Sequence, residues 1–346
     1  LPTVYTVDLR QELQEGNRSI FSRKLQELMT DRLNKGQQTI LFLNRRGYAG
    51  FVSCRSCGEV MKCPHCDVSL SEHKGGRLIC HYCGYTQPMP KLCPKCGSKY
   101  ILGFKAGTQQ IEEKLKELYP GVRTLRMDAD TTRTKDSYEK ILSSFANGEA
   151  DVLIGTQMIV KGHDFPKVTL VGILAADLSL NASDYRAGER TFQLLTQAVG
   201  RAGRGALPGE AVIQTYQPDH YAITCAAAQD YESFYQEEIL YRELSGYPPV
   251  AHMLAVQIYG KEEENVKQLA LRLTDVVKSN MDFLQILGPT PANISKINDI
   301  YRYVFYAKHA EYDTLVAVKD CVEETLRQWQ PRQLSIQFDF DPVNVL

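Results

Sequence analysis

The stretch from Cys54 to Cys96 reads CRSCGEVMKCPHCDVSLSEHKGGRLICHYCGYTQPMPKLCPKC and contains eight of the ten cysteines of the chain. Two thiolates three positions apart can bind one tetrahedral Zn²⁺, and two such pairs complete a site of four sulfur ligands. A disulfide framework is the alternative, but bridges within neighbouring pairs would be strained and nothing in the sequence suggests secretion. We therefore predict two structural zinc ions, bound by four Cys-x-x-Cys pairs: Cys54/Cys57, Cys63/Cys66, Cys80/Cys83 and Cys93/Cys96.

The gaps between the pairs indicate which pairs share a metal. Thirteen residues separate the second pair from the third, which is enough for a hairpin, whereas only five separate the first from the second. This favours a nested arrangement, with an inner site of Cys63, Cys66, Cys80 and Cys83 and an outer site of Cys54, Cys57, Cys93 and Cys96. Glycine follows three of the pairs, at Gly58, Gly84 and Gly97, where the turn needs a positive φ. His65 and His81 lie inside pairs and are expected to be exposed polar residues rather than ligands.

Composition limits the class of protein. A chain of 346 residues is expected to hold two or three domains. It has no apolar run near 18 residues and no charged-then-apolar start, so neither a membrane span nor a signal peptide is expected, and its thiols suit a reducing cytoplasm. The net charge of −1 gives no overall indication of nucleic acid. Residues 41–105 carry ten Lys or Arg against three Asp or Glu, but zinc-bound thiolates offset part of that charge.

Helical and extended segments alternate outside the cysteine-rich insert. Apolar spacing predicts helices at 22–34, at 111–119 with Thr108 as cap, at 137–145, at 192–199 and at 221–244. Apolar runs predict strands at 39–43, 124–127, 152–155, 168–174 and 211–216. This alternation is typical of a parallel α/β sheet. We assign 19–48 and 104–246 to this domain and 49–103 to the zinc insert. Residues 1–18 are expected to be a linker, because the chain starts at Leu1 in an extended stretch and looks like a piece of a longer protein.

Residues 247–346 form a separate domain in this interpretation, beginning after Gly246 and the prolines that follow it. The predicted order is strand 253–259, helix 265–278, strands 292–297 and 301–307, helix 312–329 and strand 334–340. This βαββαβ order suggests a ferredoxin-like sandwich.

Strand 301–307 of that domain is rich in aromatic residues. Tyr301, Tyr303 and Phe305 share one face, and Arg302 lies on the other with Val304 and Tyr306. One face must pack on the helices. Exposed aromatic side chains on the remainder would stack on unpaired bases while Arg302 contacts a phosphate.

Two loops of the α/β domain contain the candidate catalytic residues. The first, residues 155–166, follows a predicted strand and reads GTQMIVKGHDFP, and the second, residues 197–205, ends a predicted helix and reads QAVGRAGRG. Ligands of α/β sheets bind at the carboxyl ends of the strands. Two arginines three positions apart on a glycine-rich turn can stabilise the charge on a transferred phosphoryl group. A basic surface loop is the alternative for the second segment taken alone.

Taken together, the two loops resemble the fifth and sixth motifs of superfamily 2 helicases. The segments 43–48 (LNRRGY), 155–165 and 184–190 (DYRAGER), together with the eight-cysteine insert, closely resemble the family of primosomal protein N′, the bacterial replication-restart helicases. The resemblance covers nearly the whole chain. It implies a RecA-like second motor lobe of an ATP-dependent 3′-to-5′ DNA helicase, which acts at stalled or branched forks and restarts replication by primosome assembly.

One departure from the family limits the activity of this chain. The sequence has no Gly-x-x-x-x-Gly-Lys-Ser/Thr phosphate loop and no Asp-Glu-x-His motif, which belong to the first motor lobe. ATP and Mg²⁺ are therefore expected only in the full-length enzyme, and this chain alone should not hydrolyse ATP. The rival hypothesis is a non-enzymatic zinc adaptor for nucleic acid or protein, which would have no need for Arg201, Arg204 and Asp164 together.

The resemblance also implies roles for single residues. Arg201 and Arg204 would face the γ-phosphate, with Arg204 as the arginine finger, and Gln197 would link the two lobes. Asp164, with Gly162 before it, would lie near the ribose. The residues expected to contact DNA are Thr156, Gln157, Lys161, Arg45, Thr132 and Arg302. Single-stranded and branched DNA, single-strand-binding protein and other primosome proteins are the implied partners, with no membrane association and a cytoplasmic location.

Overall fold

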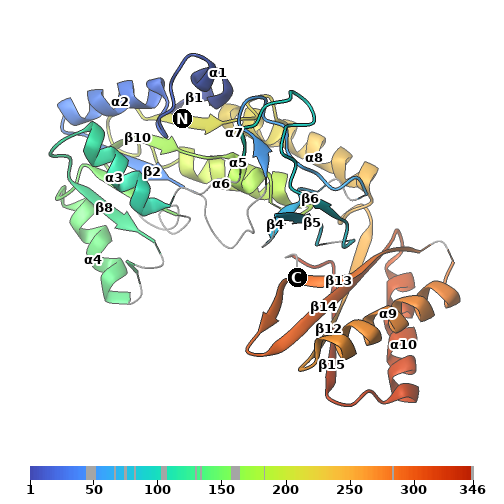
Figure 1. Ribbon diagram of the computed structural model, residues 1–346. Coiled ribbons are helices and arrows are strands. Elements are labelled where there is room, and N and C mark those ends of the chain that lie inside the picture. The colour runs from blue at the N-terminus through green and yellow to red at the C-terminus, as the bar shows by residue number, and fades with distance from the viewer. Residues whose placement is uncertain are drawn as a thin grey trace. The chain divides into compact units, whose positions relative to one another are not determined.

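The computed structural model describes residues 1–43, 52–65, 68–73, 76–81, 83–102, 107–128, 131–132, 135–156, 164–182, 184–282 and 284–343. The chain divides into two compact units, each described here by itself (Figure 1). The amino-terminal unit comprises Leu1–Val60, Pro90–Ala182 and Arg186–Tyr235. The carboxy-terminal unit comprises Met61–Met89, Ser183–Tyr185 and Gln236–Leu346.

The amino-terminal unit is built on a six-stranded sheet in the order β1-β11-β10-β2-β9-β8, and every neighbouring pair is parallel. Its central strands are continuous apolar runs, as expected where helices cover both faces of a parallel sheet. A parallel sheet with helices on both faces confirms the predicted α/β fold class. The strands are β1 (Thr3–Asp8), β2 (Gln38–Phe42), β8 (Thr124–Met127), β9 (Val152–Gly155), β10 (Val168–Ile173) and β11 (Glu210–Thr215).

Two helical layers cover this sheet. In β2, Leu41 packs in one core with α2 (Arg23–Asn34) and α3 (Thr108–Leu118). Ile40 and Phe42 point the other way, into a core with α4 (Lys135–Ala146), α6 (Ala187–Val199) and α7 (Tyr221–Ala228). The remaining elements of the unit are α1 (Leu9–Gln14), α5 (Asp177–Leu180), and the two-stranded ladder of β3 (Ser53–Cys54) with β7 (Ile101–Leu102). Helix α8 (Tyr231–Ser245) begins in this unit and ends in the other.

The carboxy-terminal unit contains the predicted βαββαβ domain, with an antiparallel sheet in the order β13-β14-β12-β15. Helices α9 and α10 share one core with Val256 and Phe305 of this sheet, whose two central strands pair in antiparallel register. The elements are β12 (His252–Gly260), α9 (Glu263–Asn280), β13 (Gln285–Ile297), β14 (Ile300–His309), α10 (Tyr312–Trp329) and β15 (Leu334–Phe340). The same unit includes the three-stranded sheet of β4 (Ser71–His73), β5 (Arg77–Ile79) and β6 (Thr86–Pro88).

Three predicted boundaries differ from the structure. The expected linker 1–18 contains an edge strand, β1, whose extended residues pair with β11, and then α1. The expected helix 221–244 is two helices, because Gln229 takes a left-handed φ of 55° and the Asp230 carboxylate accepts a hydrogen bond from Ser233 N at 3.0 Å to start α8. Helix α3 starts at Thr108 itself with Gly107 as cap, because the Thr108 hydroxyl donates to Asp128 instead.

Two further elements begin earlier than predicted. Strand β13 starts at Gln285 rather than 292, since it passes through two irregularities in its pairing with β14. Helix α6 starts at Ala187 rather than 192, with Arg186 and Glu189 forming an ion pair at 2.9 Å on its first turn. Among the described residues, no helix is both long and apolar enough to cross a membrane.

Candidate arginine site and metal centres

The structure brings the two candidate loops of the amino-terminal unit together. Arg204 and Asp164, forty residues apart in sequence, form an ion pair, and Arg201 Nη1 lies 3.8 Å from the same carboxylate oxygen. Arg204 Nε also donates to the Gly200 carbonyl at 2.8 Å, which directs its side chain back along the end of α6. Three residues that the resemblance assigned to the nucleotide therefore lie within one cluster.

Glycines hold this arginine loop in place. Gly203 has a φ of +71°, and a Cβ on it would lie 2.4 Å from Gly209 N. A Cβ on Gly205 would lie 2.5 Å from the Pro166 carbonyl oxygen, two residues beyond Asp164. Because only glycine allows such close backbone approach, the loop is fixed directly against the segment that carries Asp164.

The charges of the cluster suit an anion. Two guanidinium groups face the Asp164 carboxylate. The Asp164 side chain is 66% exposed, Arg204 40% and Arg201 12%, so the cluster opens to solvent on the Asp164 and Arg204 side. Burial, followed by the nearby Arg204 charge, lowers the pKa of Arg201 from its usual value. A phosphoryl group that displaced the Asp164 carboxylate would make bidentate contacts with the two guanidinium groups.

Two described residues of the proposed DNA-contacting set, Thr156 and Thr132, lie at the carboxyl ends of neighbouring strands. Thr156 directly follows β9 and is buried, and its N–H donates to the Met127 carbonyl at the end of β8 at 3.3 Å. Thr132 follows β8, and its hydroxyl donates to the Asp128 carbonyl at 2.6 Å. Gln197 is exposed on α6. Arg45, Gln157, Lys161 and Gly162 lie outside the described residues.

Asp128 organises the loop after β8 and was not among the predicted site residues. Its carboxylate accepts hydrogen bonds from the Thr108 hydroxyl at 2.6 Å and from Thr131 N at 3.0 Å, and Arg126 Nε lies at 3.2 Å. Burial opposes ionisation, but these hydrogen bonds and the arginine hold the pKa of Asp128 below its usual value. The sequence Asp-Ala-Asp-Thr-Thr directly after a strand was the available signal, because Asp and Thr side chains of such turns bond to nearby backbone groups.

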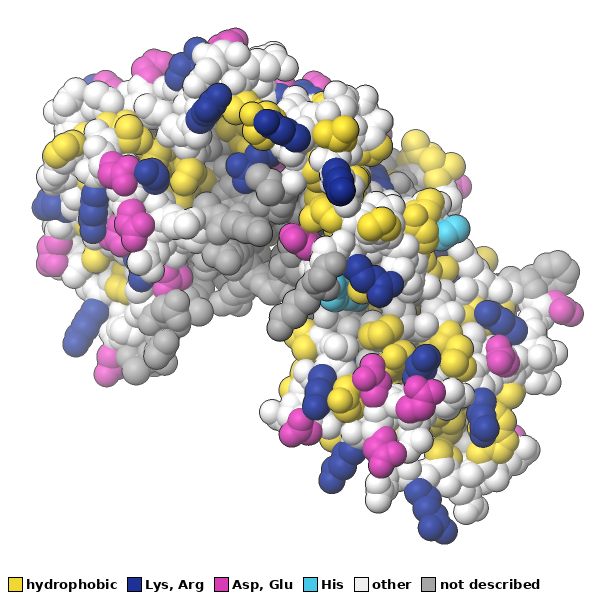
Figure 2. Space-filling model, in the orientation of Figure 1, with side chains coloured by type: hydrophobic (Ala, Val, Ile, Leu, Met, Phe, Trp, Pro, Cys, Tyr) yellow, Lys and Arg dark blue, Asp and Glu magenta, His cyan; other side chains and the backbone are white. Residues whose placement is uncertain are grey.

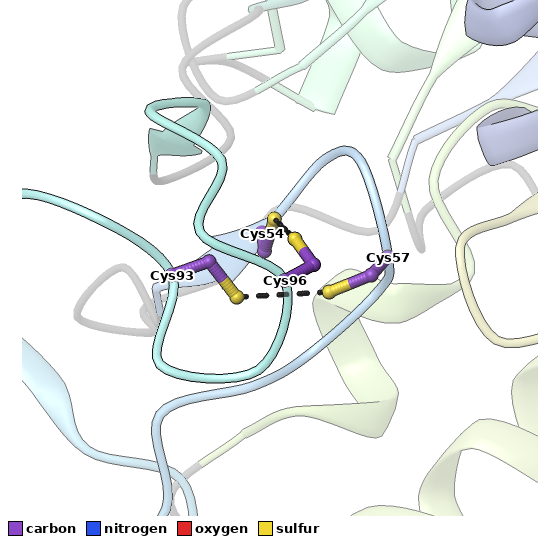
Figure 3. Close-up of side chains that lie close together, drawn as sticks. All are labelled: Cys54, Cys57, Cys93 and Cys96. Carbon is purple, nitrogen blue, oxygen red and sulfur yellow. Dashed lines mark hydrogen bonds between the residues drawn. The ribbon is translucent and has the colours of Figure 1, made fainter.

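The outer cysteines form a compact four-sulfur cluster in the amino-terminal unit (Figure 3). All four Sγ atoms lie within 4.8 Å of one another, with Cys54 and Cys96 at 3.7 Å and Cys57 and Cys93 at 3.6 Å. A tetrahedral Zn²⁺ with Zn–S bonds near 2.3 Å separates its sulfurs by about 3.8 Å. The cluster therefore has the dimensions of a structural zinc site, with the pairing that the nested arrangement predicts.

The inner cysteines lie in the carboxy-terminal unit. Cys63, Cys80 and Cys83 are grouped within the same 4.8 Å limit, with Cys63 Sγ 3.5 Å from Cys83 Sγ, while Cys66 lies outside the described residues. His65 is exposed, as predicted. The prediction that His81 is exposed is wrong, because its side chain is buried and its Nε2 lies 3.1 Å from His73 Nε2.

The knuckles at three Cys-x-x-Cys pairs share one backbone geometry. Gly58, Gly84 and Gly97 have φ values of 78°, 76° and 70°, which confirms the predicted left-handed turns. Each of these glycines donates its N–H to the carbonyl of the first cysteine of its pair, at 2.8 to 2.9 Å. The turn directs both sulfurs of a pair to the same side, as one metal requires.

Each metal centre is attached to the unit that contains it. In the amino-terminal unit, a Cβ on Gly58 would lie 2.5 Å from the Tyr216 carbonyl oxygen, so the first knuckle contacts the backbone after β11. In the carboxy-terminal unit, a Cβ on Gly84 would lie 3.4 Å from Thr290 Oγ1 of β13. The two cysteine clusters therefore contact different sheets, which the uninterrupted cysteine spacing did not indicate.

Arg302 lies on the face of the carboxy-terminal sheet opposite α9 and α10. Its guanidinium carbon is 5.7 Å from the centroid of the Tyr259 ring, and Nη1 donates to the Ile294 carbonyl at 3.5 Å. Tyr306 on the same face is fully buried and is therefore unable to stack on a base, whereas Tyr301 is half-buried beneath Lys296 Nζ at 4.8 Å. On the face drawn in Figure 2, both basic and acidic side chains are scattered over the surface.

Comparisons with known proteins match three parts of the chain. Family models match residues 243–343 ("Primosomal protein N C-terminal domain"), residues 63–88 ("PriA DNA helicase Cys-rich region (CRR) domain") and residues 92–206 ("Helicase conserved C-terminal domain"). The second match contains the inner cysteines alone, and the third contains Asp164 and both arginines.

Curated relatives match along the length of the chain. "Replication restart protein PriA" from Bacillus subtilis is 46% identical over 99% of this chain, and that from Synechocystis is 43% identical over 100%. The Treponema pallidum protein of the same name is 35% identical over 100% of this chain. These matches cover 43%, 42% and 52% of the respective relatives, so the chain spans about half the length of the curated relatives it matches.

Proposed function

The chain belongs to the PriA family of replication restart proteins, and we propose that it forms the second motor lobe, the zinc module and the carboxy-terminal domain of an ATP-dependent 3′-to-5′ DNA helicase. In this proposal ATP and Mg²⁺ are held by a first motor lobe, which this sequence does not contain. Family membership favours this function over that of a zinc adaptor.

The observation that carries the proposal is the cluster of Arg201 and Arg204 around Asp164. An ion pair with Asp164 neutralises Arg204 while no phosphate is present. The γ-phosphate of a nucleotide bound to the first lobe would replace Asp164 as the ion-pair partner of Arg204. Asp164 would then be released toward the ribose, with Gly162 beside it. Gln197, which is exposed in the last turn of α6, would bridge to the first lobe. The positive charge needed in the transition state is thus positioned before the nucleotide arrives.

Two Zn²⁺ ions complete the proposed cofactors, and both are structural. Cys54, Cys57, Cys93 and Cys96 would hold one ion, and Cys63, Cys66, Cys80 and Cys83 the other. With four sulfur ligands each, neither ion retains an open position for catalysis. Their contribution is to fold the two halves of the insert on their respective sheets.

DNA is the proposed substrate, as single strands and as branched forks. Thr156, Gln157, Lys161, Arg45 and Thr132 would follow the phosphates at the carboxyl edge of the parallel sheet, and Arg302 would contact DNA from the carboxy-terminal domain. Single-strand-binding protein and other primosome proteins are the proposed protein partners, and the cytoplasm is the proposed location.

The test of the arginine assignment uses the complete helicase that contains this chain. Arg204→Ala should lower kcat for ATP hydrolysis by roughly 10³-fold, as expected for an arginine finger. Single-stranded DNA binding should change less than about 2-fold, since the phosphate contacts to DNA lie elsewhere. Arg327→Ala, which removes an exposed arginine of α10, is the matched control and should leave kcat unaltered. ATP hydrolysis by Arg204→Ala at the control's rate would refute the assignment.

A further inference from the structure

Tyr185 lies in the segment 184–190, which resembles the family but to which no role has been assigned above. Asp184 and Tyr185 belong to the carboxy-terminal unit, and the chain enters the amino-terminal unit at Arg186. Helix α6 begins at the next residue and ends at Val199, just before Arg201. Tyr185 is therefore held by one unit and is covalently joined to the helix that leads to the arginine site of the other.

The carboxy-terminal unit encloses Tyr185 almost completely. Its side chain is 5% exposed, and its ring stacks on that of Tyr247 with centroids 4.8 Å apart and planes inclined by 8°. The guanidinium carbon of Arg242 lies 4.8 Å from the Tyr185 centroid. The Tyr185 hydroxyl donates to the carbonyl of Pro342, near the end of the described chain, at 3.2 Å.

The cations beside these rings are themselves fixed. Arg242 donates to the Glu238 carboxylate at 2.7 Å and to the Pro248 carbonyl at 2.6 Å, and it is 4% exposed. Lys308 Nζ lies 3.8 Å from the Tyr247 centroid and donates to the Ser245 carbonyl at 2.7 Å. Buried cations are stable only when they are paired and hydrogen-bonded, so the Tyr185 cluster (Tyr185, Tyr247, Arg242 and Lys308) has a single defined arrangement.

We propose that Tyr185 is a positioning residue through which the carboxy-terminal unit controls the placement of Arg201 and Arg204. Helix α6 is an uninterrupted element of 13 residues, about 20 Å long at 1.5 Å per residue. Its apolar face packs in the core of the parallel sheet through Phe192, Leu195 and Val199. A shift of Tyr185 would therefore pass along the helix as the movement of a packed, rigid element and reach the arginines at its far end.

This inference rests on the proposed function, because its consequence is a change in ATP hydrolysis. DNA bound to the carboxy-terminal unit would alter the Tyr185 cluster, and the arginines would respond at the other end of α6. Such coupling is reciprocal, so nucleotide bound at the arginines would also change the affinity of the carboxy-terminal unit for DNA. A tyrosine that only filled a core would stabilise its unit without this dependence.

The experiment measures DNA-stimulated ATP hydrolysis of the complete helicase with Tyr185→Leu, which keeps an apolar side chain but removes the stack and the cation–ring contact. The ratio of kcat with and without single-stranded DNA should fall at least about 5-fold, the lower end of typical coupling factors. The DNA affinity of the nucleotide-free enzyme should stay within about 2-fold, because the DNA contacts remain and the coupling acts only when nucleotide is bound. Tyr185→Phe keeps the ring and should retain the stimulation ratio.

Val322→Ala is the control for stability, since Val322 is fully buried in α10 of the same unit and lies outside the Tyr185 cluster. Fluorescence of Trp329, the single tryptophan, reports how far each variant weakens this unit. An unaltered stimulation ratio in folded Tyr185→Leu would overturn the proposal. So would an equal loss of the ratio in Val322→Ala at matched stability, because the effect would then be structural.

Two further measurements keep the outcomes distinct. In wild type, added single-stranded DNA should change the hydrogen-exchange rates of the first-turn amides of α6, and in Tyr185→Leu it should not. An identical response in both proteins would overturn the proposal, and this readout does not depend on ATP hydrolysis. If Tyr185→Leu does not fold, Arg242→Lys takes its place, because it retains the charge and removes the planar group over the ring. Loss of the exchange response in Arg242→Lys would support the coupling, and retention would overturn it. Normal ATP hydrolysis by Arg204→Ala would refute the proposed function alone.

Discussion

Asp177 gives the amino-terminal unit a predicted pH dependence of stability. The residue starts α5 and is buried, and its carboxylate accepts hydrogen bonds from Tyr216 N at 3.0 Å and from the Thr215 hydroxyl at 3.1 Å. Burial raises the pKa of Asp177 to about 6, against the partial opposition of these hydrogen bonds. An unfolded Asp titrates near 3.9. The folded protein therefore binds this proton more tightly than the unfolded chain does.

The sign of the effect follows from proton linkage. Below about pH 4 the carboxyl group is protonated in both states and contributes no pH dependence. Between about pH 4 and 6 the unfolded chain releases the proton while the folded protein retains it, so the free energy of unfolding falls as pH rises. Above about pH 6 the loss is complete and amounts to roughly 3 kcal/mol, from a shift of about two units at 1.36 kcal/mol each.

Asp177→Asn removes the titration and keeps an acceptor oxygen for Tyr216 N and Thr215. The free energy of unfolding of the variant, minus that of wild type, should rise by roughly 3 kcal/mol from pH 4 to pH 7. Urea titrations followed by far-UV circular dichroism would measure it, with Trp329 fluorescence identifying the separate transition of the carboxy-terminal unit. Asp177→Ala should be destabilised at every pH, because it leaves buried donors without an acceptor. A constant difference between Asp177→Asn and wild type across this range would refute the reasoning.

Two further predictions concern the metal centres. Gly58→Ala and Gly97→Ala introduce the same strained φ, but only at Gly58 would the new Cβ meet a backbone atom, the Tyr216 oxygen at 2.5 Å. The Gly58→Ala variant should therefore be less stable than Gly97→Ala by ~1–2 kcal/mol and should release zinc faster to a chelator. Equal behaviour of the two variants would show that the first knuckle does not need its contact with the backbone after β11. Cys80→Ser should lose one zinc and lower the urea midpoint of the Trp329 transition, whereas Cys96→Ser should lose the other zinc and leave that midpoint unaltered. The same shift in both variants would contradict the assignment of the two centres to different units.

Local signals in the sequence were sufficient for much of the fold. Ser22 was predicted to start the first long helix, and its hydroxyl accepts from Leu25 N as the cap of α2. The ends of strands with continuous apolar runs were predicted to within a residue or two. A short apolar run without polar alternation is typical of a strand that is buried on both faces. One exception was β1, where a stretch of alternating polar and apolar residues pairs with β11, more than two hundred residues away.

The candidate sites divide in the same way. Cysteine spacing predicted the grouping of the sulfurs, because two ligands three positions apart constrain the local backbone. It did not predict that the inner group belongs to the unit of β12–β15, since that depends on contacts such as Gly84 with Thr290. The burial of Tyr306 could not be predicted for a related reason, because alternation along β14 shows which residues share a face but not whether both faces are covered.

The division of the insert also has a consequence during biosynthesis. The inner cysteine segment, Met61–Met89, leaves the ribosome about 150 residues before Gln236, where the longest segment of its unit begins. At bacterial elongation rates this interval lasts roughly 10 s or more. A segment this short has too little core to fold alone, but metal binding can supply the folding free energy. Zinc would then keep the nascent inner ribbon ordered, and its thiols protected, until the sheet that it joins has been translated.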